Sequence, residues 1–482
     1  MAPHLPLEIL HIIAAHLQAA ESSLTQCILV CRSWRGAFEP LVYSKLRISS
    51  AATSSIEDKG VLPLDEFEKL TSDAGKMRRS WIRHIDCKIV VPHLLKNYTT
   101  IVSGNFTIDN PVRQSNDSAF QKEISNLFNL LSSWSSNLHI SLELSLHGEV
   151  LCGEEPLTCG AVDTRDFDYD GPGGQGVVPP YCATLPDGCR ANISKAACIK
   201  RLSFPPFEEH QIGAGAALHI AHYCSEITEL DLGMDGYIRP DHLEYIQSRR
   251  LAVAKGFTTA PGSLRVLHYY SQREEPWIEC LPGLQLIPDS SIDLFSINLR
   301  NLSYQLRELY LELTSVDTDF LCPLNDNNMP SGNTSETTWP YLEKITLDQH
   351  PPVLPSAWLI DLTPEGQAEF DAITDMDEAI STEENVPKRY AMDHEAFHRI
   401  FISLGYAARR MPRLREISFA LNFHVHNYFT YLRNGVEATI KWRDGPYVPD
   451  ERVARAWGFK AESLRVTGGE TYKDADVEWL DS

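Results

Sequence analysis

The glycine-rich stretch at residues 171–176 is the first place where residue types and spacing could support chemistry. Backbone N–H groups of closely spaced glycines can surround a phosphate, which would suit a nucleotide. A phosphate-binding loop of that kind also carries a Lys-Ser or Lys-Thr pair directly after the glycines, and none follows here. Asp166, Asp168 and Asp170 precede the glycines and would repel a phosphate. The composition therefore predicts an irregular loop.

The same region contains two pairs of cysteines, Cys152 with Cys159 and Cys182 with Cys189, and Cys198 lies nearby. A structural zinc site generally has about two to four residues between the ligands of a pair, so that both thiolates reach one ion. The wider separation here favours free thiols in a loop, with a zinc site or a disulfide as the alternative.

His424 and His426 alternate on what reads as a β-strand, so both imidazoles could face one side and bind a metal. We favour the simpler interpretation that these histidines and Asn422 are ordinary solvent-facing residues. The chain has no Gly-x-Ser-x-Gly, no His-Glu-x-x-His and no kinase signature set. We therefore expect no catalytic residues, no metal and no other cofactor.

Composition narrows the classes of partner. The 482 residues have a formal net charge of −22, which argues against broad binding to nucleic acid or to an anionic membrane. No apolar segment approaches the ~18 residues that a membrane-spanning helix needs, and the N-terminus is a poor signal peptide. The eleven cysteines are modest in number and odd. We expect a reducing compartment, cytoplasmic and/or nuclear.

The N-terminal residues predict three short amphipathic elements. Leu5-Pro6 begins a first helix with an apolar stripe at Ile9, Leu10, Ile13 and Leu17. Ser22 and Ser23 could cap a second helix that ends at Pro40, and residues 41–48 form a third segment. Since a unit this small rarely builds a sufficient core alone, another part of the chain or a partner must cover some of its apolar surface.

The Leu5-Pro6 start and the run Val30-Cys31-Arg32-Ser33-Trp34 together resemble an F-box of the fungal type, over about a tenth of the chain. The resemblance implies a three-helix F-box at residues 1–48 that docks on a Skp-type adaptor and, through it, a cullin. Carried over residue by residue, the expected adaptor-facing residues are Leu5, Pro6, Ile9, Leu10, Ile13, Leu24, Val30, Cys31 and Trp34.

The rest of the chain repeats a short theme of the form Leu-x-x-Leu-x-Leu. The six clearest copies are at 199–204, 227–232, 264–269, 306–311, 342–347 and 414–419, with looser copies at 82–91, 140–146 and 464–466. Helical patterns precede most copies, at 120–134, 214–223, 292–302 and 394–411. Helix and strand in alternation predict an α/β fold with parallel strands and outer helices.

The theme resembles leucine-rich repeats, but its copies lie 28 to 72 residues apart, against about 20–29 in regular repeats. We therefore expect a linker at 49–77 and an irregular leucine-rich-repeat-like α/β array at 78–482, with loop insertions at 150–197 and 361–386. The second insertion has nine acidic residues and no Lys or Arg, which predicts a solvated, mobile loop; recruitment of a basic partner is the alternative. A compact α/β domain with a mostly parallel sheet remains the alternative fold.

If the leucines of each theme face inward, the residues between them face the opposite side of the sheet. Parallel strands side by side would align these residues in a row that suits a protein ligand, because tyrosines anchor and polar neighbours orient. The expected substrate-binding residues are Glu229, Asp231, His268, Tyr270, Tyr310, Glu312, Thr346 and Asp348, and Ser418 and Asn422 extend the row.

The sequence thus favours a non-catalytic substrate receptor of a Skp/cullin/F-box ubiquitin ligase, which positions a protein substrate. The first alternative is an interaction scaffold in which the N-terminal hairpin is an integral cap of the array. The second is a metal-dependent or hydrolytic enzyme. The sequence does not indicate which protein is the substrate.

Overall fold

The N-terminal unit folds around a small core of its own. In the computed structural model it consists of α1 (Leu7–Ala19), the 3-10 turn η1 (Cys27–Leu29) and α2 (Arg32–Val42). The amides of Ile9 and Leu10 both donate to the carbonyl of Pro6, so the helix begins at the proline as expected. Five side chains fill the core of this unit: Leu10, Ala14, Leu24, Ala37 and Phe38. The structure describes residues 5–19, 24–51, 60–72, 75–94, 111–151, 181–185, 193–205, 211–233, 243–271, 276, 281–288, 292–331, 338–374, 387–421, 427–435, 437–467 and 472–477.

The second and third elements of this unit differ from the sequence prediction. The chain is extended at Cys31 (φ −164°, ψ 176°), which separates η1 from α2, and Pro40 lies inside α2 instead of ending it. Residues 45–49, expected in a third amphipathic segment, form β1 (Lys45–Ser49) and pair in parallel with β3 (His84–Leu94). Ile48 becomes fully buried by this pairing, which explains why strand pairing prevails over helix formation here.

The predicted themes form one large, mostly parallel sheet. From β3 onwards the parallel strands lie side by side in chain order, each hydrogen-bonded to the next. They are β3, β4 (Ile140–Leu151), β6 (Ile199–Phe204), β8 (Glu229–Gly233), β9 (Val266–Tyr270), β10 (Glu308–Glu312), β11 (Lys344–His350) and β14 (Glu416–Leu421). A doubly wound domain would add strands on both sides of its first strand, whereas this run grows in one direction.

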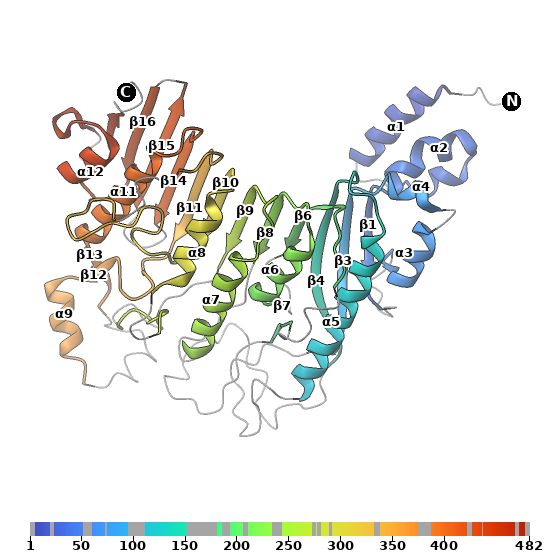
Figure 1. Ribbon diagram of the computed structural model, residues 1–482, viewed down its shortest axis with the longest axis horizontal. Helices are drawn as coiled ribbons and strands as arrows, with labels where there is room; N and C mark the ends of the chain where they lie inside the picture. Colours follow the sequence, from blue (N-terminus) through green and yellow to red (C-terminus); the bar gives the residue numbers. More distant parts are fainter. Residues whose placement is uncertain are drawn as a thin grey trace.

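Helices cover one face of the sheet. Figure 1 shows α5 (Pro111–Ser132), α6 (Ala214–Tyr223), α7 (Leu243–Phe257) and α8 (Leu294–Ser303) along the same side. Each precedes a strand of the array, and α11 (His394–Ala408) precedes β14 in the same way. The sequence pattern predicted α5, α6, α8 and α11 in these places, whereas α7 was not among the predicted helices. The expectation of a mixed α/β fold with parallel strands and outer helices is confirmed.

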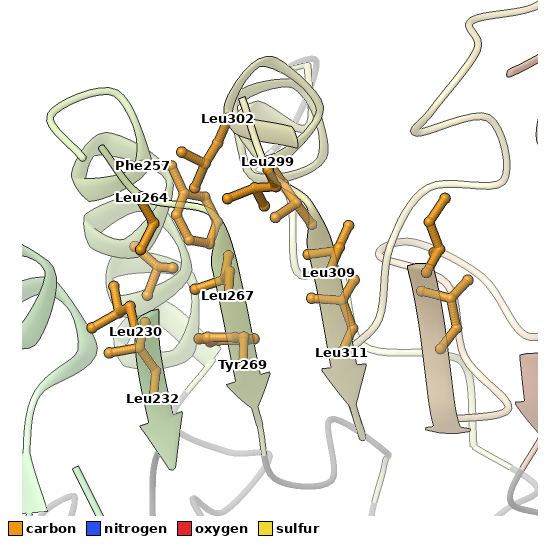
Figure 2. Close-up of a cluster of buried hydrophobic side chains, with 14 of the residues drawn as sticks. Leu230, Leu232, Phe257, Leu264, Leu267, Tyr269, Leu299, Leu302, Leu309 and Leu311 are labelled. Atoms are coloured by element: carbon orange, nitrogen blue, oxygen red, sulfur yellow. The ribbon is translucent and has the colours of Figure 1, made fainter. Parts of the chain in front are cut away.

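The leucines of the theme hold helices and sheet together. Leu230, Leu267 and Leu309 are direct register partners, and each is at most 1% exposed. They point toward the helix side, where Phe257 and Leu299 pack over them (Figure 2). Burying one such side chain contributes roughly 1.5–3 kcal/mol, so a repeated ladder of them fixes which face of each strand is inside.

Some segments that were expected to be irregular contain regular structure. The range expected to be a linker, 49–77, includes β2 (Leu62–Pro63), α3 (Leu64–Thr71) and the start of α4 (Lys76–Arg79), and Phe67 in α3 is fully buried. Inside the acidic insertion, residues 364–371 form the helix α9 (Pro364–Asp371). Thr363 explains its start, because the Thr363 hydroxyl accepts a hydrogen bond from the amide of Gly366 at 3.1 Å. Residues 375–386 lie outside the described residues.

The C-terminal end of the sheet is antiparallel, which the sequence did not predict. Residues 464–466, expected to be a last parallel copy, instead contribute to an edge strand that pairs antiparallel with residues 472–474. The antiparallel strands are β15 (Asn427–Asn434), β16 (Glu437–Arg443), β17 (Arg465–Thr467) and β18 (Tyr472–Asp476). The remaining elements are α12 (Glu451–Trp457), η7 (Ala461–Ser463), and two small sheets, β5 (Cys182–Ala183) with β7 (Gln211–Ile212) and β12 (Ile360–Leu362) with β13 (Arg389–Met392).

Candidate protein-binding surfaces

The N-terminal unit exposes large apolar side chains on two of its segments. Leu5, Ile9 and Ile12 follow the i, i+4, i+7 spacing of one helix face, while Leu10 and Ala14 occupy the buried face. The second segment is η1 with the residue that follows it. The exposed set spans 41% to 75% relative exposure and comprises Leu5, Leu7, Ile9, Ile12, Leu29 and Val30. Several exposed large apolar side chains on two neighbouring segments of a small unit are more than the single ones that a protein surface normally shows, which favours an interaction site.

The structure separates the predicted adaptor-facing residues into two groups. Leu5, Pro6, Ile9, Val30 and Cys31 are exposed, and Ile13 and Trp34 are half-buried. Leu10 and Leu24 must be corrected, because both are buried in the core of the unit and are not available to a partner in this conformation. The inward and outward stripes are hard to separate by sequence since α1 is apolar around most of its circumference. The sequence prediction did not include Leu7, Ile12 and Leu29 among the adaptor-facing residues, although the structure shows that they are exposed.

A polar and aromatic joint connects the unit to the rest of the chain. Arg78 of α4 forms an ion pair with Glu39 at 3.5 Å and lies 5.2 Å from the ring centroid of Tyr43. Tyr43 stacks on Trp81 with ring centroids 6.3 Å apart. The carbonyl of Ser44 accepts hydrogen bonds from the next segment, at residues 83 and 84. Helix α2 and strand β1 therefore carry the attachment, and α1 projects beyond the end of the sheet (Figure 1).

The second surface is the face of the sheet opposite the helices. Asp231, His268, Tyr310 and Thr346 are direct register partners on β8, β9, β10 and β11, so they form one row across the strands. The next row, toward the carboxyl ends of the strands, contains Tyr270, Glu312 and Asp348. Ser418 continues the first row on β14, and Glu229 lies one row earlier. The structure thus brings the predicted substrate-binding residues together on one face, and their binding role stays a prediction. Asn422 lies outside the described residues.

This face is open to solvent at its β6–β8 end, and its outward residues on β9, β10 and β11 are half-buried. Glu229, Asp231 and Arg201 have side chains 47%, 37% and 48% exposed, in contrast to the fully buried leucines between them. Arg201 lies 3.6 Å from Glu229 and 3.5 Å from Asp231, so the charges at the β6–β8 end are paired.

At β10 and β11 the charges are arranged differently. The Tyr310 hydroxyl is within hydrogen-bond distance of two carboxylates, 2.7 Å from Glu312 Oε2 and 3.0 Å from Asp348 Oδ2. The side-chain amide of Gln349 donates to Glu312 Oε1 at 3.2 Å. Burial, followed by the hydrogen bonds to these carboxylates, raises the pKa of Tyr310 far above its ordinary value, so the phenol stays neutral. The ring of His268 lies 5.4 Å from that of Tyr310.

The candidate chemical sites from the sequence are largely outside the described residues. That holds for the glycine-rich stretch 171–176, for Cys152, Cys159 and Cys189, and for His424 and His426. The cysteines at 182 and 198 are described and buried, and the seven described cysteines are all free of disulfides. Within the described ranges, no group of three or more His, Cys, Asp or Glu side chains could hold a metal ion. In the same ranges, each helix is too short or too polar to cross a membrane.

Comparison with known proteins identifies one part of the chain. Residues 2–49 match the family model described as F-box-like. No curated protein matches the chain, and no solved structure matches it. The chain therefore carries an F-box-like domain at its N-terminal end, which confirms the F-box prediction for that region. The matched range contains the six exposed apolar residues and β1.

Proposed function

We propose that this protein is a substrate-recognition subunit of a Skp/cullin/F-box ubiquitin ligase. In this proposal residues 2–49 bind a Skp-type adaptor, which links the chain to a cullin, and the open sheet face binds a protein substrate. F-box domains typically bind Skp-type adaptors, and the match to the F-box-like family is the observation that carries the proposal.

The exposed apolar residues of the N-terminal unit support an adaptor contact. The unit already has a core of its own, so the exposed leucines and isoleucines of α1 are not needed to complete it. Removing side chains of this size from water contributes roughly 1.5–3 kcal/mol each, enough for a few of them to hold a partner. Ile9, Ile12 and Val30 are the strongest candidates because they are large, exposed and on the two open segments.

The array supports a receptor role. Its strands follow one another in chain order with leucines inward and polar and aromatic residues outward, which fits a leucine-rich-repeat-like array that presents a continuous binding face. A receptor of this kind works by holding a substrate near the transferring enzyme, which raises the effective concentration of the reactants. The proposal assigns no catalytic step, metal or cofactor to this chain, and it places the protein in the cytoplasm and/or nucleus.

The test is binding to a purified Skp-type adaptor. The double variant Ile9→Asp/Val30→Asp introduces two charges at exposed positions, so the unit should fold while adaptor affinity falls by about 50-fold or more, since each buried charge costs several kcal/mol. Calorimetric titration of the full-length chain measures this.

The matched control is Leu294→Asp. Leu294 is 46% exposed at the first turn of α8, where a carboxylate favours the helix N-terminus, so adaptor affinity should stay unchanged. Failure of the intact chain to bind the adaptor would contradict the proposal.

A further inference from the structure

The open sheet face is not uniform in charge. At β6 and β8 the carboxylates of Glu229 and Asp231 are paired with Arg201, and farther along Lys344 lies 3.2 Å from Glu416. At the carboxyl ends of β10 and β11, Glu312 and Asp348 form no ion pair with any described residue. Two carboxylates therefore lie side by side, and the donors that reach them from the described part of the chain are the neutral groups of Tyr310 and Gln349.

The hydrogen bonds at this point hold the two carboxylates in place without neutralising them. One phenol, that of Tyr310, lies between them, and Gln349 donates its side-chain amide to Glu312 and its backbone amide to Asp348. A carboxylate offers about four lone-pair sites, so each retains acceptor positions for another donor. Gln349 adopts a left-handed backbone conformation (φ 46°), which is uncommon for a residue other than glycine.

Aromatic residues occupy positions next to the two carboxylates on the sheet. Tyr270 is the register partner of Glu312 on β9, and His268 and Tyr310 occupy the row behind it. Neighbouring strands lie about 4.8 Å apart, so a group of the size of a guanidinium could contact carboxylates on two strands while it lies against a ring. Arginine suits such a place better than lysine because its planar fork donates to two acceptors at once.

We propose that the face formed by Tyr270, Tyr310, Glu312 and Asp348 binds an arginine-containing basic segment of a protein partner. This inference rests on the proposed function, since it names the class of substrate that the sheet face would select. Charge complementarity is the argument for the occupant: two adjacent carboxylates that form no ion pair with a described residue attract a cationic segment and repel nucleic acid. We propose a protein segment and not a metal ion as the ligand, because no group of three or more His, Cys, Asp or Glu among the described residues could hold a metal.

The experiment measures peptide binding by fluorescence anisotropy with the full-length chain. The probe is an eight-residue peptide of alternating arginine and serine, labelled with a neutral dye, and the same peptide with lysine or glutamate in place of arginine serves for comparison. We expect the arginine peptide to bind more tightly than the lysine peptide, and the glutamate peptide not to bind. The variant Glu312→Gln/Asp348→Asn keeps the shape of both side chains and should weaken the arginine peptide about tenfold or more.

The matched control is Glu369→Gln/Glu462→Gln. It removes the same number of charges from exposed positions on α9 and η7, away from the sheet face, and should change affinity less than about twofold. Equal losses in the two double variants would show attraction by net charge alone and would overturn the inference, as would equal binding of the glutamate peptide.

The outcome separates this inference from the proposed function. Adaptor binding by Glu312→Gln/Asp348→Asn should equal that of the unmodified chain, because the F-box-like domain is untouched. Adaptor binding without selective peptide binding would refute only the basic-segment inference. Selective peptide binding without adaptor binding would refute the ligase role and leave the face as a site for basic segments.

Discussion

The N-terminal unit and the array leave opposite kinds of surface open. The unit has five buried side chains and exposes leucine, isoleucine and valine. The array has one continuous core and exposes carboxylates, tyrosines and a histidine on its uncovered sheet face. Apolar exposure is unfavourable until a partner covers it, whereas a polar face is stable in water. In the proposed function, the apolar end would hold a permanent partner and the polar sheet face an exchangeable one.

The largest expected effect comes from a cavity in the core of the N-terminal unit, which tests whether this unit is independent of the array. Phe38 is fully buried and stacks on Trp34 with ring centroids 5.1 Å apart. Phe38→Ala should remove about 3–5 kcal/mol from the N-terminal unit, which a core of five residues cannot absorb. We expect rapid hydrogen exchange over residues 5–42 and loss of adaptor binding, while the melting of the array is unchanged.

The control for this cavity is Leu7→Ala, which truncates an exposed side chain of the same unit and should leave hydrogen exchange unchanged. A parallel loss of protection in the array strands after Phe38→Ala would show that the two regions unfold together. The distinction between an independent unit and an integral cap would then disappear.

A pH dependence should arise in the array. His350 is buried, its Nδ1 lies 2.7 Å from the carbonyl oxygen of Pro351, and burial lowers its pKa to about 4. The pKa of His350 in the folded chain is below the value of about 6.5 in the unfolded chain, so the unfolded chain takes up a proton first as pH falls. The free energy of unfolding therefore keeps its full value above pH 6.5 and decreases by about 3 kcal/mol as pH falls to 4.

Urea unfolding at pH 7 and pH 4 measures this difference. The variant His350→Asn keeps a donor near the position of Nδ1 but does not titrate, so its loss of stability over the same range should be about 3 kcal/mol smaller. Identical pH dependence in the two proteins would show that His350 is not the group responsible.

The sequence predicted the elements whose hydrophobic period was clear. The strand at 199–204 and the helix at 214–223 have the predicted bounds. The predicted segments 306–311 and 394–411 correspond to the strand at 308–312 and the helix at 394–408. The shared face of His268 and Tyr310 also followed, because alternation fixes which side of a parallel strand a residue occupies.

Other features depend on contacts that are distant in sequence. Residues 45–49 are a strand because β3 lies beside them, and the antiparallel end of the sheet depends on pairing among β15, β16 and β18. The shared hydrogen bonds of Glu312 and Asp348 depend on a register that only the folded sheet defines. Leu10 and Leu24 were misassigned because the sequence does not show whether an apolar residue of a small unit faces the core of that unit or a partner.

The smallest expected effect on the stability of the array comes from a deletion of the N-terminal unit that ends before β1. Residues 45–49 belong to the large sheet, so a deletion that ends at residue 48 would remove β1 and leave the edge of β3 unpaired. A deletion of residues 1–43 keeps β1 and the carbonyl of Ser44, which accepts hydrogen bonds from Arg83 and His84. It loses the stacking of Tyr43 on Trp81 and the Arg78–Glu39 ion pair, two partly exposed contacts that together contribute about 1 kcal/mol.

Denaturant unfolding should therefore show an array close to its original stability, with adaptor binding abolished and binding of the arginine peptide retained. An unfolded product would mean that the N-terminal unit is a structural cap, and the contrast between the two surfaces would not imply two partners.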